Sequence, residues 1–172
     1  MSPTNPRAIR WNTRNAVYSD TIVLWSTLEQ ENVTFFLSSC SILMEVASKA
    51  GWPLRGAIAA GECVIHQGDG LFLGQPIIRA LDLEKAQDWI GVGIDTLCAD
   101  DPVCGDSVRQ HVDVREYHVP VKPGSPAIEW AVTWHERDPD STAAIRHMME
   151  RAPRNHAARY EATIAFLRKG RR

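Results

Sequence analysis

The sequence has little that would commit it to a membrane, to nucleic acid or to an oxidising compartment. No apolar run reaches the roughly 18 residues of a membrane helix, and the N-terminus lacks the apolar core of a signal peptide. The 19 basic and 21 acidic residues nearly cancel, which does not favour binding to an anionic membrane or to nucleic acid. We therefore expect a soluble, cytoplasmic protein whose four cysteines (Cys40, Cys63, Cys98 and Cys104) are reduced thiols.

The chain also lacks internal repeats and low-complexity tracts. Its 172 residues are enough for one domain that buries a core without metal or disulfide crosslinks. Residues 1–15 are polar and contain two prolines and three arginines, which predicts an N-terminal arm or a short edge strand. Residues 16–172 are predicted to form a single domain.

Local patterns predict strands that alternate with helices. Apolar residues recur at the helical period from Asn32, a predicted N-cap, to Gly51, a predicted C-cap. Pro76 is predicted to open a second helix, and two more helices are predicted to be capped at residues 138–139 and at Asn155. The predicted strands cover residues 16–25, 54–64, 71–73, 89–96, 114–121 and 128–134. Residues 98–112 are predicted to form a loop with room for one helical turn. This order predicts an α+β fold: a mixed sheet with helices mainly on one face.

Three segments carry a resemblance to a known family. Residues 18–23 read Tyr-Ser-Asp-Thr-Ile-Val, residues 54–62 read Leu-Arg-Gly-Ala-Ile-Ala-Ala-Gly-Glu, and residues 72–84 contain Gly-Gln-Pro-Ile-Ile-Arg-Ala-Leu-Asp-Leu-Glu. In this order they resemble the catalytic domain of bacterial class III nucleotidyl (adenylate or guanylate) cyclases. Residues 119–124 and 160–167 resemble a set of bacterial cyclase-like proteins. The resemblance implies a ferredoxin-like, cyclase-type sheet.

The resemblance also shows which functional positions are changed. It places Asp20 at the second of two metal-binding aspartates. The first would lie well upstream, and the 19 residues before Asp20 contain no Asp or Glu. Ala16 stands where purine cyclases have a base-selecting lysine. The transition-state asparagine and arginine fall on Ile78 and Asp82, neither of which can stabilise charge on a phosphate.

The chain therefore resembles a degenerate, N-terminally truncated cyclase domain, for which we expect no catalysis and no cofactor. Mg²⁺ or Mn²⁺ would be needed only if it were catalytic. Arg55, Glu62 and Arg79 are the candidates for contact with a nucleotide.

Loss of the family's first strand predicts unpaired edges on the strand that contains Asp20 and on the strand that contains Arg55. Such edges favour pairing. We expect either the arm around residues 7–11 or a partner subunit to fill this position. By analogy with cyclases, a homodimer or a complex with a cyclase-like chain is expected.

Each candidate also has a structural interpretation. Asp20 can be an acid at the end of a strand, and Glu62 a solvated hairpin residue. For Arg79 and Asp82, an exposed ion pair along one helix is favoured. Residues 68–70 read Gly-Asp-Gly, which favours a tight turn over a phosphate loop.

A zinc site and two nucleic-acid contacts are also conceivable. The spacing of Cys98, Cys104, His111 and His118 does not match structural zinc sites, so loop residues without metal are favoured. Trp130 and Trp134 could stack on bases, but a period-2 apolar stripe favours a buried strand face. The basic residues at 168–172 could contact phosphate, or complement a helix dipole.

Three functions follow in order of preference. The first is a non-catalytic cyclase-homology domain that dimerises or binds a nucleotide or partner. The second is an active nucleotidyl cyclase, completed by a partner or an upstream segment; the pyrimidine-directed enzymes of antiphage signalling are the variant of this function that it would resemble. The third is a module associated with nucleic acid, which only the basic ends of the chain support.

Overall fold

The computed structural model describes residues 13–134 and 140–169. Its strands are β1 (Arg14–Tyr18), β2 (Thr21–Trp25), β3 (Gly56–Ile58), β4 (Val64–His66), β5 (Leu71–Leu73), β6 (Val92–Ile94), β7 (Val114–Glu116) and β8 (Trp130–Val132). Its α-helices are α1 (Gln30–Ala50), α2 (Gln75–Ala86), α3 (Thr96–Asp100), α4 (Gly105–Gln110), α5 (Ser141–Arg151) and α6 (Ala157–Arg168). Short 3-10 turns cover Gln67–Asp69 and Arg154–His156.

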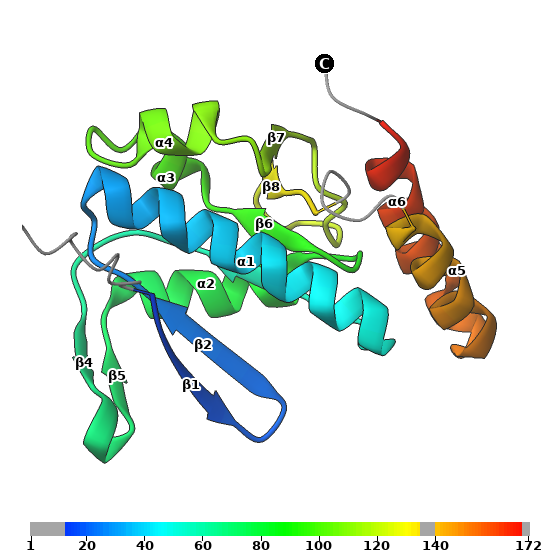
Figure 1. Cartoon of the computed structure of the whole chain (residues 1–172), viewed down its shortest axis with the longest axis horizontal. Helices are drawn as coiled ribbons and strands as arrows, with labels where there is room; N and C mark the ends of the chain where they lie inside the picture. The colour runs from blue at the N-terminus through cyan, green and yellow to red at the C-terminus, as the bar shows by residue number, and fades with distance from the viewer. Residues whose placement is uncertain (1–12, 135–139, 170–172) are drawn as a thin grey trace, which may run out of the picture.

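The predicted α+β class and mixed sheet are confirmed. Four strands form one sheet in the order β3-β6-β8-β7, in which β3 and β6 are parallel and the other two pairs are antiparallel. Two antiparallel hairpins, β1–β2 and β4–β5, are separate from this sheet and extend to the same side of the molecule (Figure 1).

Helix α1 follows its sequence pattern closely, with one difference at its start. It ends as predicted at Gly51, whose φ of 75° is the left-handed conformation that glycine adopts without strain. Its N-cap is Glu29, however, and Asn32 lies buried inside the first turn. The Asn32 side chain donates hydrogen bonds to Thr27 Oγ1 and Glu29 Oε2, both at 2.8 Å.

Helix α1 is also long and apolar enough, by length and composition alone, to cross a membrane; no other helix among the described residues meets that test. Its buried face, which includes Val33, Leu37 and Met44, instead joins the two apolar clusters of the core. One face of this helix therefore contributes to the core.

Helices cover both faces of the four-stranded sheet, rather than mainly one face as predicted. Ile58, Ile94 and Val132 point to the α1 side, where they pack with Val33, Leu37 and Cys40. Successive side chains of a strand point to opposite faces. The residues between, Ala57, Gly93 and Ala131, therefore point to the other side. Gln87, at the end of α2, and Phe166 of α6 lie against this other face. A side-chain carbon added to Gly93 would meet Gln87, and the Arg115 guanidinium lies over the Phe166 ring.

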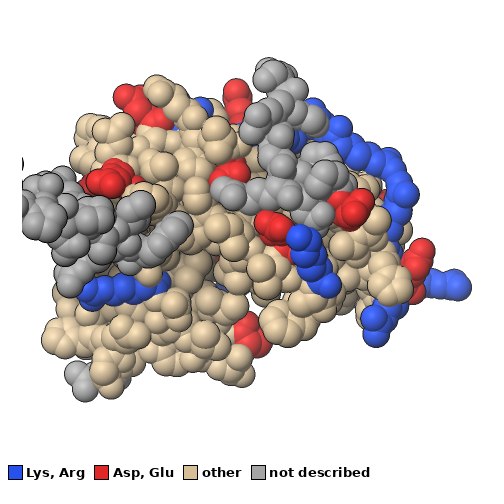
Figure 2. All heavy atoms as spheres, viewed as in Figure 1, with Lys and Arg blue, Asp and Glu red and all other residues tan. Residues whose placement is uncertain are grey.

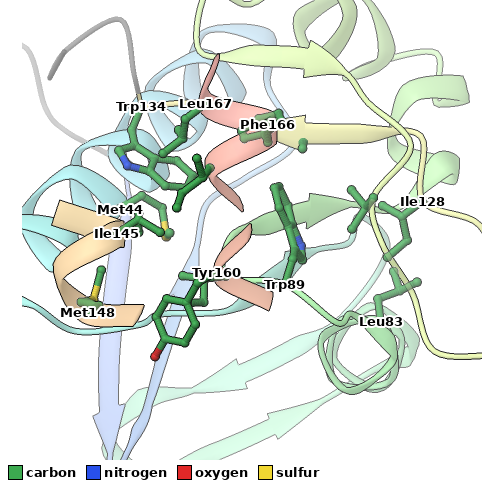
Figure 3. Packing of buried hydrophobic residues seen from close by; sticks show 14 residues of the cluster. Met44, Leu83, Trp89, Ile128, Trp134, Ile145, Met148, Tyr160, Phe166 and Leu167 are labelled. Carbon is green, nitrogen blue, oxygen red and sulfur yellow. The ribbon is translucent and has the colours of Figure 1, made fainter. Parts of the chain in front are cut away.

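A second apolar cluster joins the sheet to the C-terminal helices (Figure 3). Trp89 meets Phe166 edge-to-face, with ring centroids 5.0 Å apart, and Trp134 is fully buried beside them. Trp134 is therefore a core residue, as favoured, while Trp130 is half-buried. Burial of each such large side chain contributes about 1.5–3 kcal/mol. This cluster fixes α5 and α6 to the sheet.

Four local predictions are wrong. The single strand predicted over residues 16–25 is interrupted by a turn at residues 19–20 and forms the two strands of the β1–β2 hairpin. The single strand predicted over residues 54–64 is two strands, β3 and β4, which belong to different sheets. The loop predicted over residues 98–112 contains most of α3 and all of α4. The cap predicted at Asn155 lies within a 3-10 turn, and His156 precedes α6 instead. The cap predicted at residues 138–139 lies outside the described residues.

The predicted strand edges are present. Strand β2 pairs only with β1, and β3 pairs only with β6, so each has one unpaired edge among the described residues. Strand β1 begins at Arg14, within the predicted 1–15 arm. The arm around residues 7–11, expected to fill the missing strand, lies outside the described residues.

Candidate functional site

The predicted metal residue, Asp20, lies in the two-residue turn between β1 and β2 and is exposed. The residue before it, Ser19, has a φ of 54°. The described parts of the chain contain no group of three or more His, Cys, Asp or Glu residues that could hold a metal ion. Asp20 is therefore a single carboxylate at a hairpin tip, and metal binding there stays a prediction.

Arg79 is engaged within the fold. Its Nε lies 2.8 Å from Asp95 Oδ2, and its Nη2 donates a hydrogen bond to Ala60 O at 2.7 Å. The Nε–Oδ2 contact is an ion pair without the alignment of a hydrogen bond. Because Ala60 follows β3 and Asp95 follows β6, Arg79 holds α2 against the ends of two parallel strands. The Arg79–Asp82 ion pair favoured from the sequence is replaced by this contact.

Arg55 is engaged in the same way at the opposite end of β3. Its Nε lies 2.6 Å from Glu84 Oε1, and its Nη1 donates to Gln87 O at 3.2 Å. Glu62 is exposed, just before β4. The structure therefore does not bring the three predicted nucleotide contacts together, because the length of β3 separates Arg55 from Arg79.

The two positions that match the family's transition-state pair lie on the outer surface of α2. Ile78 is 54% exposed, and Asp82 is exposed one turn further along. Leu81, 47% exposed, lies on the same helix face as Ile78. This surface contains apolar side chains and an acid, which makes it more suitable for a protein partner than for a triphosphate.

The β4–β5 hairpin, which precedes α2 in the chain, also carries exposed apolar side chains. Val64 is opposite Leu73, and His66 is opposite Leu71, so these side chains share one face. Val64, Leu71 and Leu73 are 54%, 41% and 55% exposed. On the other face, Phe72 packs edge-to-face on Tyr18 and Trp25 of the β1–β2 hairpin, at 5.7 and 5.4 Å. A small hairpin that is apolar on both faces indicates an interaction surface.

A Ser-His-Asp cluster outside this surface is not arranged as a catalytic triad. Ser38 Oγ donates to Asp113 Oδ2 and lies near His111 Nε2, at 3.4 Å in each case. His111 Nδ1 accepts a hydrogen bond from Asp113 N at 3.0 Å, and Nε2 lies 3.0 Å from Thr34 O. This network assigns the imidazole proton to Nε2. The histidine then cannot accept the serine proton there, as a general base must.

The cysteines of the conceivable zinc site are packed in the core. Cys98 and Cys104 are 2% exposed, and Cys104 Sγ donates to Cys98 O at 3.3 Å. Burial raises the pKa of Cys98 to about 12 and that of Cys104 to about 11. Since a metal ligand must be a thiolate, these pKa shifts oppose coordination.

Two adjoining hollows lie where α1 and α5 end. Their volumes are about 470 and 120 Å³, and they share Pro53 and Tyr160. Lys49 and Arg151 line the larger hollow, and residues 141–169 carry six Lys or Arg and two Asp or Glu. Figure 2 shows this basic side of the molecule. Both residues lie in the last turn of their helices, where a cation complements the helix dipole, so a structural role accounts for them.

Comparison with known proteins adds no assignment: no family model, no curated protein and no solved structure matches the chain.

Two residues that connect α2 to β3 and β6, Asp95 and Gln87, were not predicted from the sequence. Asp95 follows a buried strand, and its Oδ1 accepts a hydrogen bond from Leu97 N at the start of α3. An acid between a strand and a helix is a recognisable N-cap signal. The burial of Gln87, which is 0% exposed, had no such local signal.

Proposed function

We propose that this protein is a non-catalytic domain of the nucleotidyl cyclase-homology type, located in the cytoplasm, whose function is to associate with a second copy of itself or with a cyclase-like chain. The observation that carries the proposal is the exposed apolar surface of β4–β5 and α2, formed by Val64, Leu71, Leu73, Ile78 and Leu81. Burial of this surface on association would contribute about 25 cal/mol for each Å² of apolar area removed from water.

The contacts of the predicted nucleotide-binding and metal-binding residues support association over catalysis. Arg55 and Arg79 are already paired with carboxylates, so neither offers an unpaired charge to a phosphate. Asp20 has no partner carboxylates that complete a metal-binding group among the described residues. A two-metal reaction needs several such ligands in one place.

Association is tested by measuring the mass of the purified chain by size-exclusion chromatography with light scattering. We expect twice the 19.2 kDa of one chain, because a twofold dimer would bring the apolar surfaces of two copies together and remove both from water. The double substitution Leu71→Ser and Leu73→Ser should give a monomer. Val112→Ser, which changes an apolar residue before β7 that is more exposed than Leu71 or Leu73, is the control and should leave the mass unchanged.

A monomeric wild-type chain would leave only a cyclase-like partner as the associating chain. Failure of the double variant to weaken either complex would overturn the proposed surface.

Catalysis is tested separately by incubating the chain with each of the four ribonucleoside triphosphates and Mg²⁺ or Mn²⁺. We expect no cyclic nucleotide. A cyclic product that is abolished by Asp20→Asn would instead support the second candidate, an active cyclase that uses Asp20 as a metal ligand. A thermal-shift panel with the same nucleotides tests binding without turnover.

A further inference from the structure

Within residues 13–134 and 140–169, strand β3 has an edge that no other strand pairs with. Gly56 N donates to Gly91 O at 3.0 Å, and Ile58 O accepts from Asp95 N at 2.8 Å, so both residues face β6. Backbone groups alternate in direction along a strand. Ala57 therefore directs its N–H and C=O away from β6, to the edge without a neighbouring strand. Residues 56–60 read Gly-Ala-Ile-Ala-Ala, without the charge or proline that usually protects an edge.

Strand β2 presents a second edge of the same kind. Tyr18 and Thr21 flank the two-residue turn and lie opposite one another, which in such hairpins is the hydrogen-bonded pair. By alternation, Ile22 and Leu24 direct their N–H and C=O away from β1. Among the described residues, neither of these edges has a neighbouring strand.

The two edges belong to one structural unit. Leu24 of β2 and Ile58 of β3 both pack against the apolar cluster that contains Val33 and Leu37 of α1. Strand β2, helix α1 and strand β3 follow one another in the chain, which is the order of a β-α-β unit, a motif whose two strands are parallel. In Figure 1, β2 lies on the side of its hairpin that faces α2 and the main sheet. The unit therefore has the arrangement of a split β-α-β motif that lacks its middle strand.

We propose that a β-strand donated by another polypeptide pairs with both edges and joins the two sheets in the order β1-β2-donor-β3-β6-β8-β7. This inference rests on the proposed associating function and specifies the chemistry of the partner. Backbone pairing would supply the affinity, and the side chains of the donor the specificity, as in other cases of strand addition.

The surroundings of β2 define the donor's chemistry. Leu24 faces the α1 cluster, and Trp25, on the opposite face, packs on Phe72 of β5 at 5.4 Å. A strand beside β2 would thus be covered on both faces and should be uncharged and apolar over about five residues, the length of β2. Residues 7–11 of this chain contain Arg7 and Arg10, whose burial without partners is unfavourable. This makes the N-terminal arm a poor donor.

The test is hydrogen exchange on the full chain, titrated with a synthetic peptide of five Val and Ile residues flanked by lysines. We expect exchange of the Ala57, Ile22 and Leu24 amides to slow at least about tenfold at saturation, since each gains a hydrogen-bond acceptor or becomes covered. A peptide of the same composition with a central proline should have no effect. Equal slowing by both peptides, or no slowing by either, would overturn the proposal.

Two substitutions of the edge keep the test specific. Ala57→Pro removes only the outward N–H, so the hydrogen bonds of Gly56 and Ile58 to β6 are kept while the peptide response should be lost. Ala57→Ser is the matched control and should respond as the wild type. If Ala57→Pro does not fold, Ala59→Lys places a protecting charge on the same edge and should also abolish the response.

The experiments distinguish a failure of the proposed self-association from a failure of the proposed strand pairing. The Leu71→Ser and Leu73→Ser variant should lose the dimer but keep the peptide response. A dimer without any peptide response would support the proposed function and overturn the strand proposal. If the three amides in a monomer without peptide already exchange as slowly as that of Gly93, the chain itself fills the edge, which also overturns the proposal.

Discussion

Gln87 illustrates how one buried polar residue can connect several elements. Its Oε1 accepts hydrogen bonds from Trp89 Nε1 at 2.7 Å and from Gly93 N at 3.1 Å. Its Nε2 donates to Gly56 O at 2.8 Å and to Leu83 O at 3.1 Å. The amide therefore connects α2 to β3, β6 and the main aromatic cluster, and no water is needed to satisfy it.

Replacing Gln87 with methionine keeps the length of the side chain but removes all four hydrogen bonds. We expect Gln87→Met to lower the free energy of unfolding by about 3 kcal/mol, because Trp89 Nε1 and Gly93 N would be left buried without partners. Urea denaturation followed by tryptophan fluorescence measures this. Gln110→Met, at the exposed end of α4, is the control and should change stability by less than about 0.5 kcal/mol. A similar loss in both variants would contradict the role assigned to Gln87.

The four cysteines differ sharply in their surroundings. Cys40, Cys98 and Cys104 are buried, and burial raises the pKa of Cys40 and Cys98 to about 12 and of Cys104 to about 11. A raised pKa keeps a thiol protonated and unreactive at neutral pH. Cys63, before β4, is exposed.

We therefore expect iodoacetamide to modify one thiol of the folded protein at pH 8, with Cys63 as the site. Intact-mass spectrometry should show a single adduct in the native chain and four adducts in denaturant. The Cys63→Ser variant should show no native adduct. Rapid modification of Cys98 or Cys104 under native conditions would mean that the α3–α4 region opens more readily than its burial indicates.

At the scale of single elements, the β1–β2 turn contains a conformational strain that can be removed. Ser19 has a φ of 54°, a conformation that costs a non-glycine residue about 1–2 kcal/mol. In two-residue hairpin turns with a positive φ at the first central position, glycine is the preferred residue there. The sequence places a serine at this position.

Ser19→Gly should therefore stabilise the hairpin by up to about 1 kcal/mol, after allowance for the entropy that glycine loses on folding. The amides of Ala16 and Val23 should exchange more slowly in this variant. Asp20→Gly is the matched control, because Asp20 does not have a positive φ, and glycine there adds only entropy to the unfolded chain. If both variants speed exchange, the strain at Ser19 is not significant.

The elements that could be predicted from the sequence are those whose signals are local. The helical period of α1, its Gly51 cap, Pro76 at the start of α2 and the hairpin turn at residues 67–70 depend on neighbouring residues alone. The division of residues 54–64 into β3 and β4 could not be predicted, because it depends on long-range pairing of β3 with β6 and of β4 with β5. Helices α3 and α4 are too short for a periodic signal.

The candidate site also has features that depend on neighbouring residues and features that depend on the tertiary fold. The exposed position of Asp20 in a hairpin turn agrees with its structural interpretation. The partners of Arg55 and Arg79 lie 29 and 16 residues away along the chain, in Glu84 and Asp95, and only the tertiary fold brings these groups together. The resemblance to nucleotidyl cyclases concerns the order of motifs, and it stays a prediction.

At the scale of the whole molecule, the two hairpins and the four-stranded sheet should differ in stability. The sheet packs between α1 on one face and α2 and α6 on the other, whereas the hairpins extend from this body (Figure 1). The hairpins contact each other through Phe72 and through a hydrogen bond from Gln67 Nε2 to Asn15 O at 3.1 Å. An isolated two-stranded hairpin is marginally stable in water, so each hairpin depends on this mutual contact.

We expect native-state hydrogen exchange to show the hairpins opening at a free energy at least about 2 kcal/mol below that of the sheet. The amides of Ala16 and Val23 should thus exchange at least about thirtyfold faster than those of Gly93 and Ala131. Phe72→Ala should accelerate exchange in both hairpins together and leave Gly93 unchanged, because the aromatic contact couples the two. Acceleration of only one hairpin would show that they open independently. Equal exchange in the hairpins and the sheet would mean that the whole chain unfolds as one cooperative unit, which would require stronger contacts to the hairpins than those seen here.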